Sequence, residues 1–218
     1  MDITSRFWEA SSGIYERIRS HPFLQGLTSG DLDREAFRHY VVQDSHYLRE
    51  YARALNVLAA KAPTSADTGM FGEHATNANA VEQALHAGFL AELGGVDQPP
   101  SPTTTAYTNF LLATVHNGSF AEGLAAVLPC YWIYARVGAD LLAASSPDPL
   151  YARWIATYGG DDFQKIVDAV LALTDRHAAA LGPADHEAMH RAYLTAARYE
   201  WMFWDAAHRR ETWPIPLA

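Results

Sequence analysis

Three polar side chains lie within strongly apolar stretches of the sequence and could carry chemistry. Asp44 lies in HYVVQDSHYL, Cys130 in AAVLPCYWIYARVG and Glu200 in ARYEWMFWDAA. Burying a carboxylate is unfavourable by several kcal/mol unless the group is paired. Two carboxylates on predicted core faces therefore need partners or a chemical purpose. The structural alternative is that each one caps or bridges helices, and position alone leaves both interpretations open.

Each of these polar residues has aromatic neighbours at helical spacing. The pairs are Asp44 with Tyr47 and Tyr51, Cys130 with Tyr134, and Glu200 with Phe203 and Trp204. Residues three, four or seven positions apart share one face of a helix, so each polar group is predicted to meet its rings. Rings combined with a few fixed polar groups suit a flat heteroaromatic ligand. An ordinary aromatic core gives the same spacing and is the alternative.

Cys130 follows Pro129 inside an apolar stretch that otherwise predicts a helix. A proline within a helix removes one backbone hydrogen bond and opens the preceding turn, which could expose the thiol to a pocket. A cysteine becomes a nucleophile only where its thiolate is stabilised, and no His or Lys lies within four residues of this one. Any base must come from another helix, and the alternative is an inert, buried thiol.

The elements that must position these residues are predicted to be helices throughout. The chain has 38 Ala and 21 Leu against only 17 Val plus Ile, and this composition favours helices over strands. Proline, glycine and acidic helix starts delimit eight helical segments. Their approximate bounds are 3–20, 33–61, 66–93, 103–116, 120–144, 150–158, 161–181 and 183–210. We expect an all-α bundle forming a single domain over residues 1–218, with its ligand site between helices.

Charge and cysteine content restrict the partners and the compartment. Sixteen Lys and Arg against 25 Asp and Glu give a net charge of −9, the wrong sign for binding nucleic acid. The longest uncharged apolar stretch, from Gly123 to Ala135, is shorter than the roughly 20 residues that span a bilayer. The single cysteine forms no internal disulfide, and the first residues lack the pattern of a signal peptide. We therefore expect a cytoplasmic protein without a membrane span.

Several motifs, in this order along nearly the whole chain, resemble the TenA family of thiaminase II or aminopyrimidine aminohydrolase enzymes. The resemblance rests on Phe7-Trp8, HPF at 21–23, FRHYVVQDSHYL at 37–48, LPCYWIYARVG at 128–138, WIATYGGDDF at 154–163, YEWMFWDAA at 199–207 and Trp213-Pro214. The elements QD.HYL, PC.W.Y and YE..FW are specific in combination. The resemblance implies a haem-oxygenase-like helical fold, and the presence of Cys130 indicates the cysteine-containing branch.

The resemblance also assigns roles to individual residues. Cys130 corresponds to the nucleophile, Asp44 to the aspartate that binds the pyrimidine, and Glu200 to the glutamate that shuttles protons. The implied substrate-binding rings are Tyr47, Tyr107, Tyr134, Tyr158 and Phe203. Tyr107, in TTTAYTNFLL, has the weakest local motif. His46 receives no role.

The activity implied is thiamine salvage, in which 4-amino-5-aminomethyl-2-methylpyrimidine is hydrolysed to the hydroxymethyl pyrimidine. Thiamine itself and a formylated precursor are alternative substrates. Such a reaction needs a soft nucleophile, a carboxylate for the pyrimidine edge and an acid for the leaving group. No metal or organic cofactor is expected, because the ring itself delocalises the electrons. The resemblance further implies a homotetramer.

Two rival interpretations remain. The same fold houses di-iron and haem enzymes, and Glu82 with His86, and Asp175 with His177, are conceivable iron ligands. The E-x-x-H spacing typical of di-iron bundles is absent at these positions, and His21 before a proline is a poor haem ligand; we expect it to help close the first helix. A non-enzymatic regulatory or interaction protein is the second rival.

Overall fold

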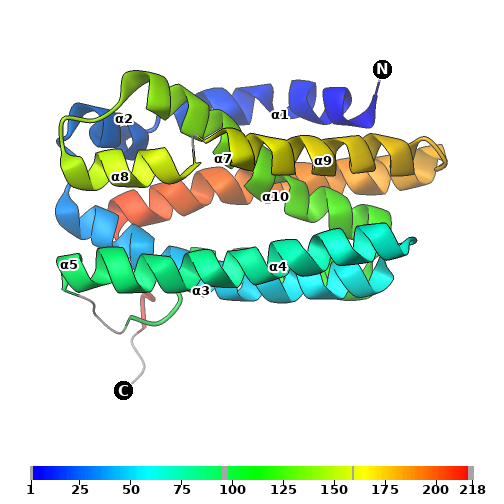
Figure 1. The fold of residues 1–218 in the computed structure, drawn as a ribbon, viewed down its shortest axis with the longest axis horizontal. Helices are drawn as coiled ribbons and strands as arrows, with labels where there is room; N and C mark the ends of the chain where they lie inside the picture. Colours follow the sequence, from blue (N-terminus) through cyan, green and yellow to red (C-terminus); the bar gives the residue numbers. More distant parts are fainter. Residues whose placement is uncertain (1, 95–97, 159, 216–218) are drawn as a thin grey trace. The chain divides into compact units, whose positions relative to one another are not determined.

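A computed structural model describes residues 2–94, 98–158 and 160–215, and it contains helices and no strand within those ranges (Figure 1). The helices are α1 (Ile3–Arg19), α2 (Pro22–Ser29), α3 (Arg34–Lys61), α4 (Ser65–Leu85), the π-helical turn η1 (His86–Leu90), α5 (Ala91–Leu93), α6 (Pro102–Asn117), α7 (Phe120–Ala144), α8 (Pro149–Tyr158), α9 (Asp161–Ala178) and α10 (Pro183–Arg209). The all-α prediction is confirmed.

Helix α2 is absent from the predicted segments, and its sequence explains how it forms. Pro22 occupies the first turn, where its missing N–H needs no partner. The Nδ1 atom of His21 accepts a hydrogen bond from the backbone N–H of Phe23 at 3.1 Å, which caps the helix. The backbone N–H of His21 also donates to the carbonyl of Ile18 at 2.9 Å. His21 therefore closes α1, as expected, and also begins α2.

The predicted segment 66–93 is divided in the structure. An α-helix covers Ser65–Leu85, a π-helical turn covers His86–Leu90, and the helix ends at Leu93 before Gly94, which has a positive φ of 71°. A π-turn is a single-turn bulge inside an α-helix and is too short to end the helical segment. Periodicity alone therefore predicts one continuous helix here.

The chain divides into two compact units, each described here by itself. Unit 1 contains residues 1–32 and 121–201, and unit 2 contains residues 33–120 and 202–218. Helix α10 contributes residues to both units.

In unit 1, α1 packs against α9 and is joined to it by polar contacts. The backbone N–H and the Oγ1 hydroxyl of Thr4 donate to the carboxylate of Asp175 at 3.0 and 2.7 Å. The fully buried ring of Phe7 stacks on Tyr193 of α10, with centroids 4.7 Å apart. These contacts fix α9 and the unit 1 part of α10 against α1.

In unit 2, α3 lies beside α4 along most of its length and also packs against α6 (Figure 1). Asp33 caps α3, because its side chain accepts a hydrogen bond from the backbone N–H of Glu35 at 3.0 Å. The buried ring of Tyr40 stacks on Trp204 with centroids 5.1 Å apart and an interplanar angle of 6°. Helix α3 is thus the central element of unit 2.

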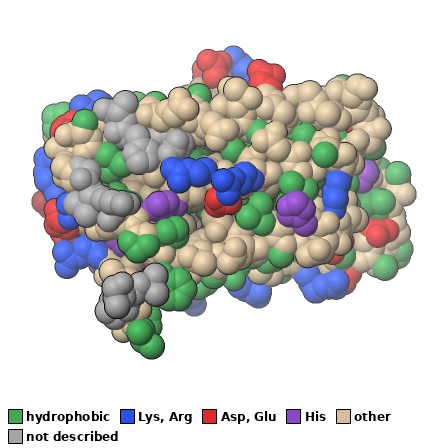
Figure 2. All heavy atoms as spheres, turned by 90° about the horizontal axis from the view of Figure 1, so that it is seen from below, with side chains coloured by type: hydrophobic (Ala, Val, Ile, Leu, Met, Phe, Trp, Pro, Cys, Tyr) green, Lys and Arg blue, Asp and Glu red, His purple; other side chains and the backbone are tan. Residues whose placement is uncertain are grey.

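On the face shown in Figure 2, acidic and basic side chains are interspersed rather than gathered by sign. Several exposed charges pair along one helix, as Arg53 does with Glu50 at 2.8 Å. Such pairs contribute about 0.3–0.5 kcal/mol each, so burial rather than surface charge accounts for most of the stability. Within the described part of the chain, no helix combines the length and apolarity needed to cross a bilayer.

Candidate active site

Asp44 lies near the middle of α3 and is buried, with 2% of its surface exposed. Tyr47 follows it by three residues, so the two side chains share one face of the helix. A carboxylate held on a 28-residue helix of the core has little freedom to move. The structure therefore confirms that Asp44 is buried on a core face of the helix.

Three of the predicted substrate-binding rings meet in unit 2. The centroid of Tyr47 lies 4.9 Å from that of Tyr107 on α6 and 5.6 Å from that of Phe203 on α10. Tyr51 also stacks on Tyr47, with centroids 5.5 Å apart. Tyr47, Tyr107 and Phe203 are each 4% exposed or less. Together with Asp44, these three rings form what we call the aspartate half-site.

Tyr40 supports the aspartate half-site and is missing from the predicted site residues. Its ring meets Phe203 edge-on, with centroids 5.9 Å apart, while its face stacks on Trp204. Tyr40 precedes Asp44 by four residues. The helical spacing used to link Asp44 with Tyr47 would also have found it.

Cys130 lies on α7 in unit 1. The helix runs from Phe120 to Ala144 through Pro129, so the proline does not end it. The Cys130 side chain is partly exposed and forms no disulfide. Tyr134, one turn later, is buried with 6% exposed. Tyr158 is the last residue of α8, and its side chain lies outside the described residues.

Glu200 lies on α10 and is 1% exposed. Two turns earlier on the same helix, the hydroxyl of Tyr193 lies 3.2 Å from that of Ser11. Burial raises the pKa of Tyr193 above its usual value, and the negative charge of Glu200 adds to the rise. The Tyr193 ring also contacts Trp132 of α7, with centroids 6.3 Å apart. Helix α10 therefore contacts the helix that carries Cys130.

The predicted site residues are divided between the two units. Asp44, Tyr47, Tyr107 and Phe203 lie in unit 2, while Cys130, Tyr134, Tyr158 and Glu200 lie in unit 1.

The alternative iron site falls partly on undescribed side chains, those of Glu82 and His86. Of the other pair, Asp175 accepts both hydrogen bonds of Thr4. Among the residues that the structure describes, no three His, Cys, Asp or Glu side chains are grouped as metal ligands. The oxygen atoms of Asp175 thus act in joining α1 to α9.

Several relatives match almost the whole chain, among them two aminopyrimidine aminohydrolases. The aminopyrimidine aminohydrolase of Bacillus subtilis is 39% identical over 209 residues, which cover 94% of this chain and 89% of that protein. The aminopyrimidine aminohydrolase of Halalkalibacterium halodurans is 32% identical over 222 residues, covering 98% of each chain.

Solved structures show the same fold. A TenA homologue from P. horikoshii is 31% identical and covers 96% of this chain and 99% of its own, with a TM-score of 0.86. A domain from Shewanella denitrificans, described as having a heme oxygenase-like fold, superposes with a TM-score of 0.73 at 14% identity over 96% of this chain and 93% of its own. The predicted haem-oxygenase-like fold is confirmed. Because the TENA/THI-4/PQQC family matches residues 8–210, this chain belongs to that family.

Proposed function

We propose that this protein is an aminopyrimidine aminohydrolase of thiamine salvage. The observation that carries the proposal is the buried carboxylate of Asp44 on the helix face of Tyr47, whose ring contacts those of Tyr107 and Phe203, in a chain 39% identical to an enzyme of that name. The substrate is 4-amino-5-aminomethyl-2-methylpyrimidine, which is hydrolysed to the 5-hydroxymethyl compound with release of ammonia. Thiamine is a second substrate, with its thiazole as the leaving group.

The aspartate half-site binds the pyrimidine. The carboxylate of Asp44 accepts hydrogen bonds from the 4-amino group and from a protonated ring nitrogen beside it, and a charged acceptor strengthens both bonds. The rings of Tyr47 and Phe203 provide faces and edges for the flat heterocycle, at about 0.5–1.5 kcal/mol for each aromatic pair. Binding in this way holds the substituent at C5 in a fixed direction.

Cys130 acts as the nucleophile. Its thiolate adds to the pyrimidine ring, and the electrons displaced expel the amine from the exocyclic methylene carbon. Water then adds to that carbon, and the sulfur leaves the ring, which restores both the aromatic system and the thiolate. The partial exposure of Cys130 supports this role, because a nucleophilic thiol must be accessible to its substrate. Tyr134, one turn after Cys130 on α7, is the ring we assign to the same part of the site.

Glu200 carries the protons. As a carboxylic acid it protonates the departing amine, and as a carboxylate it then accepts a proton from the attacking water. Phe203 follows Glu200 by three residues on α10, a spacing that puts the acid and a pyrimidine-binding ring on one face of that helix.

The remaining features of the proposal concern the whole protein. We infer that both units act as one domain and that the enzyme is a cytoplasmic homotetramer. It requires no metal or cofactor and binds neither nucleic acid nor membrane. Sedimentation or light scattering of the purified protein tests the tetramer directly.

A turnover assay tests the activity. The purified protein, treated with a chelator, is incubated separately with the aminomethyl pyrimidine and with thiamine, and the hydroxymethyl pyrimidine is quantified. We expect the product to form at the same rate before and after chelation. Activity that returns only when iron is added would favour the iron enzyme, and no product from either substrate would refute the proposal.

Cys130→Ser is the matching variant test. Serine keeps the size of the side chain, but its hydroxyl is a far weaker nucleophile at neutral pH. We expect kcat to fall below detection while the melting temperature stays within a few degrees of the wild type. A serine variant with the wild-type kcat would exclude attack by the cysteine and leave the pyrimidine-binding part of the proposal intact.

A further inference from the structure

The backbone segment Gln98–Ser101, which we call the α6 strap, leads directly into α6 and is held by α3. Gln43 is 2% exposed, and its side chain binds the strap at two points. Its Nε2 donates to the carbonyl of Pro99 at 3.1 Å, and its Oε1 accepts from the backbone N–H of Ser101 at 2.8 Å. The side-chain amide of Gln43 therefore fixes the α6 strap on α3 at two points.

His46 provides a third attachment on the same face of α3. Its Nε2 lies 2.7 Å from the carbonyl oxygen of Gln98. Because a carbonyl only accepts, this nitrogen must carry the proton. Gln43 and His46 are three residues apart and thus neighbours on the helix surface. The histidine without a role in the sequence has a structural partner here.

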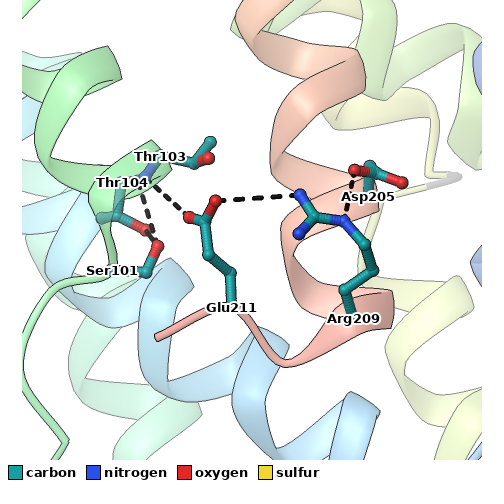
Figure 3. Close-up of polar contacts among 6 residues, drawn as sticks. All are labelled: Ser101, Thr103, Thr104, Asp205, Arg209 and Glu211. Atoms are coloured by element: carbon teal, nitrogen blue, oxygen red, sulfur yellow. Dashed lines mark hydrogen bonds and ion pairs between the residues drawn. The ribbon is translucent and has the colours of Figure 1, made fainter. Parts of the chain in front are cut away.

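The C-terminal tail contacts the α6 strap and the first turn of α6 (Figure 3). Glu211 Oε2 accepts from the backbone N–H of Thr103 at 2.8 Å, and its Oε1 lies 3.7 Å from Nη2 of Arg209. Arg209 in turn donates from Nε to Asp205 at 2.7 Å. Beyond the region drawn, the indole N–H of Trp213 donates to the carbonyl of Pro100 at 2.9 Å.

These contacts satisfy the donors at the start of α6 with unusual completeness. Pro102 has no N–H, Glu211 accepts from Thr103, and the hydroxyl of Ser101 accepts from the N–H of Thr104 at 3.2 Å. The negative charge of Glu211 also interacts favourably with the positive end of the helix dipole. The first turn of α6 is consequently fixed in position and in rotation about the helix axis.

Tyr107 lies little more than one turn beyond this fixed start. Its ring is 1% exposed and lies 4.9 Å from the ring of Tyr47, which α3 itself carries. Gln43 therefore acts on both partners of this contact, because it belongs to α3 and binds the segment that begins α6. A small shift of α6 would move the ring of Tyr107 away from that of Tyr47 and change the shape of the aspartate half-site.

We propose that Gln43 and Glu211 are positioning residues for the aspartate half-site. By binding the start of α6, they hold the ring of Tyr107 against the ring of Tyr47. The inference rests on the proposed function, in which the aspartate half-site binds the pyrimidine. Neither residue touches the substrate. Their effect reaches it through the backbone of α6 and the ring of Tyr107.

The test combines steady-state kinetics on the aminomethyl pyrimidine with hydrogen exchange of the α6 amides. Gln43→Leu removes both amide contacts and leaves the buried N–H of Ser101 without its acceptor. Glu211→Ala removes the tail contact, whereas Glu211→Gln keeps an oxygen that accepts from Thr103. Val115→Ala is the matched control, because it creates a small cavity at the opposite, buried end of the same helix.

For Gln43→Leu we expect KM to rise about tenfold, a loss of binding free energy equal to about one hydrogen bond, with kcat within about threefold of wild type. Exchange of the amides from Thr103 to Tyr107 should accelerate about tenfold. Glu211→Ala should show the same pattern at about threefold, and Glu211→Gln should recover most of the wild-type KM. Val115→Ala should lower the melting temperature without changing KM.

Faster amide exchange with an unchanged KM would overturn the proposal, because the contacts of Gln43 and Glu211 would then stabilise α6 without affecting substrate binding. A KM that rises equally in Val115→Ala would overturn it too. If Gln43→Leu does not fold, Glu211→Ala decides by the same criteria, since Glu211 is partly exposed in the tail. A wild type inactive on the pyrimidine would refute the proposed function. Hydrogen exchange of the amides from Thr103 to Tyr107 would still show whether the contacts of Gln43 and Glu211 fix α6. Unchanged protection of these amides in the variants would overturn the proposal.

Discussion

Asp44 and Glu200 are both buried carboxylates, yet their surroundings suit them to different tasks. Asp44 shares a helix face with Tyr47, whose ring contacts three further aromatic rings, and this arrangement suits holding a flat cation. Glu200 lies on α10 two turns from Tyr193, and burial is the largest cause of the raised pKa of that tyrosine. A carboxylate that binds and a carboxyl group that exchanges protons need different environments of this kind.

Asp44→Asn is expected to weaken pyrimidine binding. Asparagine keeps the shape of the side chain but loses the charge and half of the accepting capacity, so it cannot pair with both the amino group and the protonated ring nitrogen. We expect KM to rise about 10- to 100-fold, equivalent to roughly 1.5–3 kcal/mol for hydrogen bonds to a charged group. Steady-state kinetics measures this change, and unchanged KM and kcat would remove Asp44 from the site.

Glu200→Gln is expected to lower kcat by about 10²- to 10⁴-fold, the usual contribution of a positioned acid or base. Glutamine preserves the shape and can donate a hydrogen bond, but it cannot exchange a proton. If Glu200 only bridged helices, the variant would instead lose a few kcal/mol of stability and turn over normally. Measuring kcat and the melting temperature on one preparation separates these outcomes, and a destabilised but fully active variant would contradict the catalytic role.

The helices were largely predictable because their ends are encoded locally. Segment 33–61, for example, is predicted from acidic residues at its start and Ala62-Pro63 at its end, and α3 is observed from Arg34 to Lys61. Helix α2 was missed because a single ring nitrogen of His21 and the following proline create it within eight residues. The π-turn at His86–Leu90 was missed because it covers only five residues within a longer helical segment, with no proline signal comparable to a helix end.

Gly30 ends α2 in a conformation that only glycine adopts without strain, and Gly30→Ala is expected to destabilise the protein. Its φ is +82°, and a Cβ built there would lie 2.7 Å from Cγ of Pro147, a rigid ring atom. Left-handed strain and the clash together should lower the free energy of unfolding by about 1–3 kcal/mol. Chemical denaturation measures this loss.

Gly13→Ala is the matched control for this substitution. Gly13 is exposed within α1, and a Cβ there meets nothing within 4 Å. Alanine has the higher helix propensity, so this variant should be up to about 1 kcal/mol more stable than wild type. Equal effects of the two substitutions would contradict the assignment of strain to Gly30.

At the scale of the whole molecule, the sequence indicated which residues could carry chemistry, but it did not indicate the contacts that position them. Asp44, Cys130 and Glu200 stand out because polar groups in apolar helical stretches are visible in one dimension, and their catalytic roles stay predictions. The hydrogen bonds of Gln43 to Pro99 and Ser101, and of Glu211 to Thr103, join residues 56 to 108 positions apart. Such pairings depend on how helices pack, which no local pattern encodes.

Buried titratable groups also make the stability of the whole protein depend on pH. Burial lowers the pKa of His39 and of His74 below the ordinary value of 6.5. For His39, carboxylate and amide neighbours, Glu211 and Gln98, oppose the shift only in part, and the nearby guanidinium groups of Arg210 and Arg38 add to it. The folded protein therefore disfavours the imidazolium form at both sites. Burial likewise raises the pKa of Tyr15 and Tyr193 above 10.0, so their phenolate forms are disfavoured.

The sign of the pH effect follows from which state binds more protons. As pH falls below about 6.5, the unfolded chain protonates its histidines before the folded one does, so the free energy of unfolding decreases. As pH rises above about 10, the unfolded chain loses its tyrosine protons first, and stability falls again. We expect a plateau between these values, measured by denaturant titration at a series of pH values. His39→Gln with His74→Gln should flatten the acid limb alone, while Tyr15→Phe should reduce the slope of the alkaline limb alone. An acid limb unchanged in the double histidine variant would show that carboxylate protonation, rather than these buried imidazoles, limits stability at low pH.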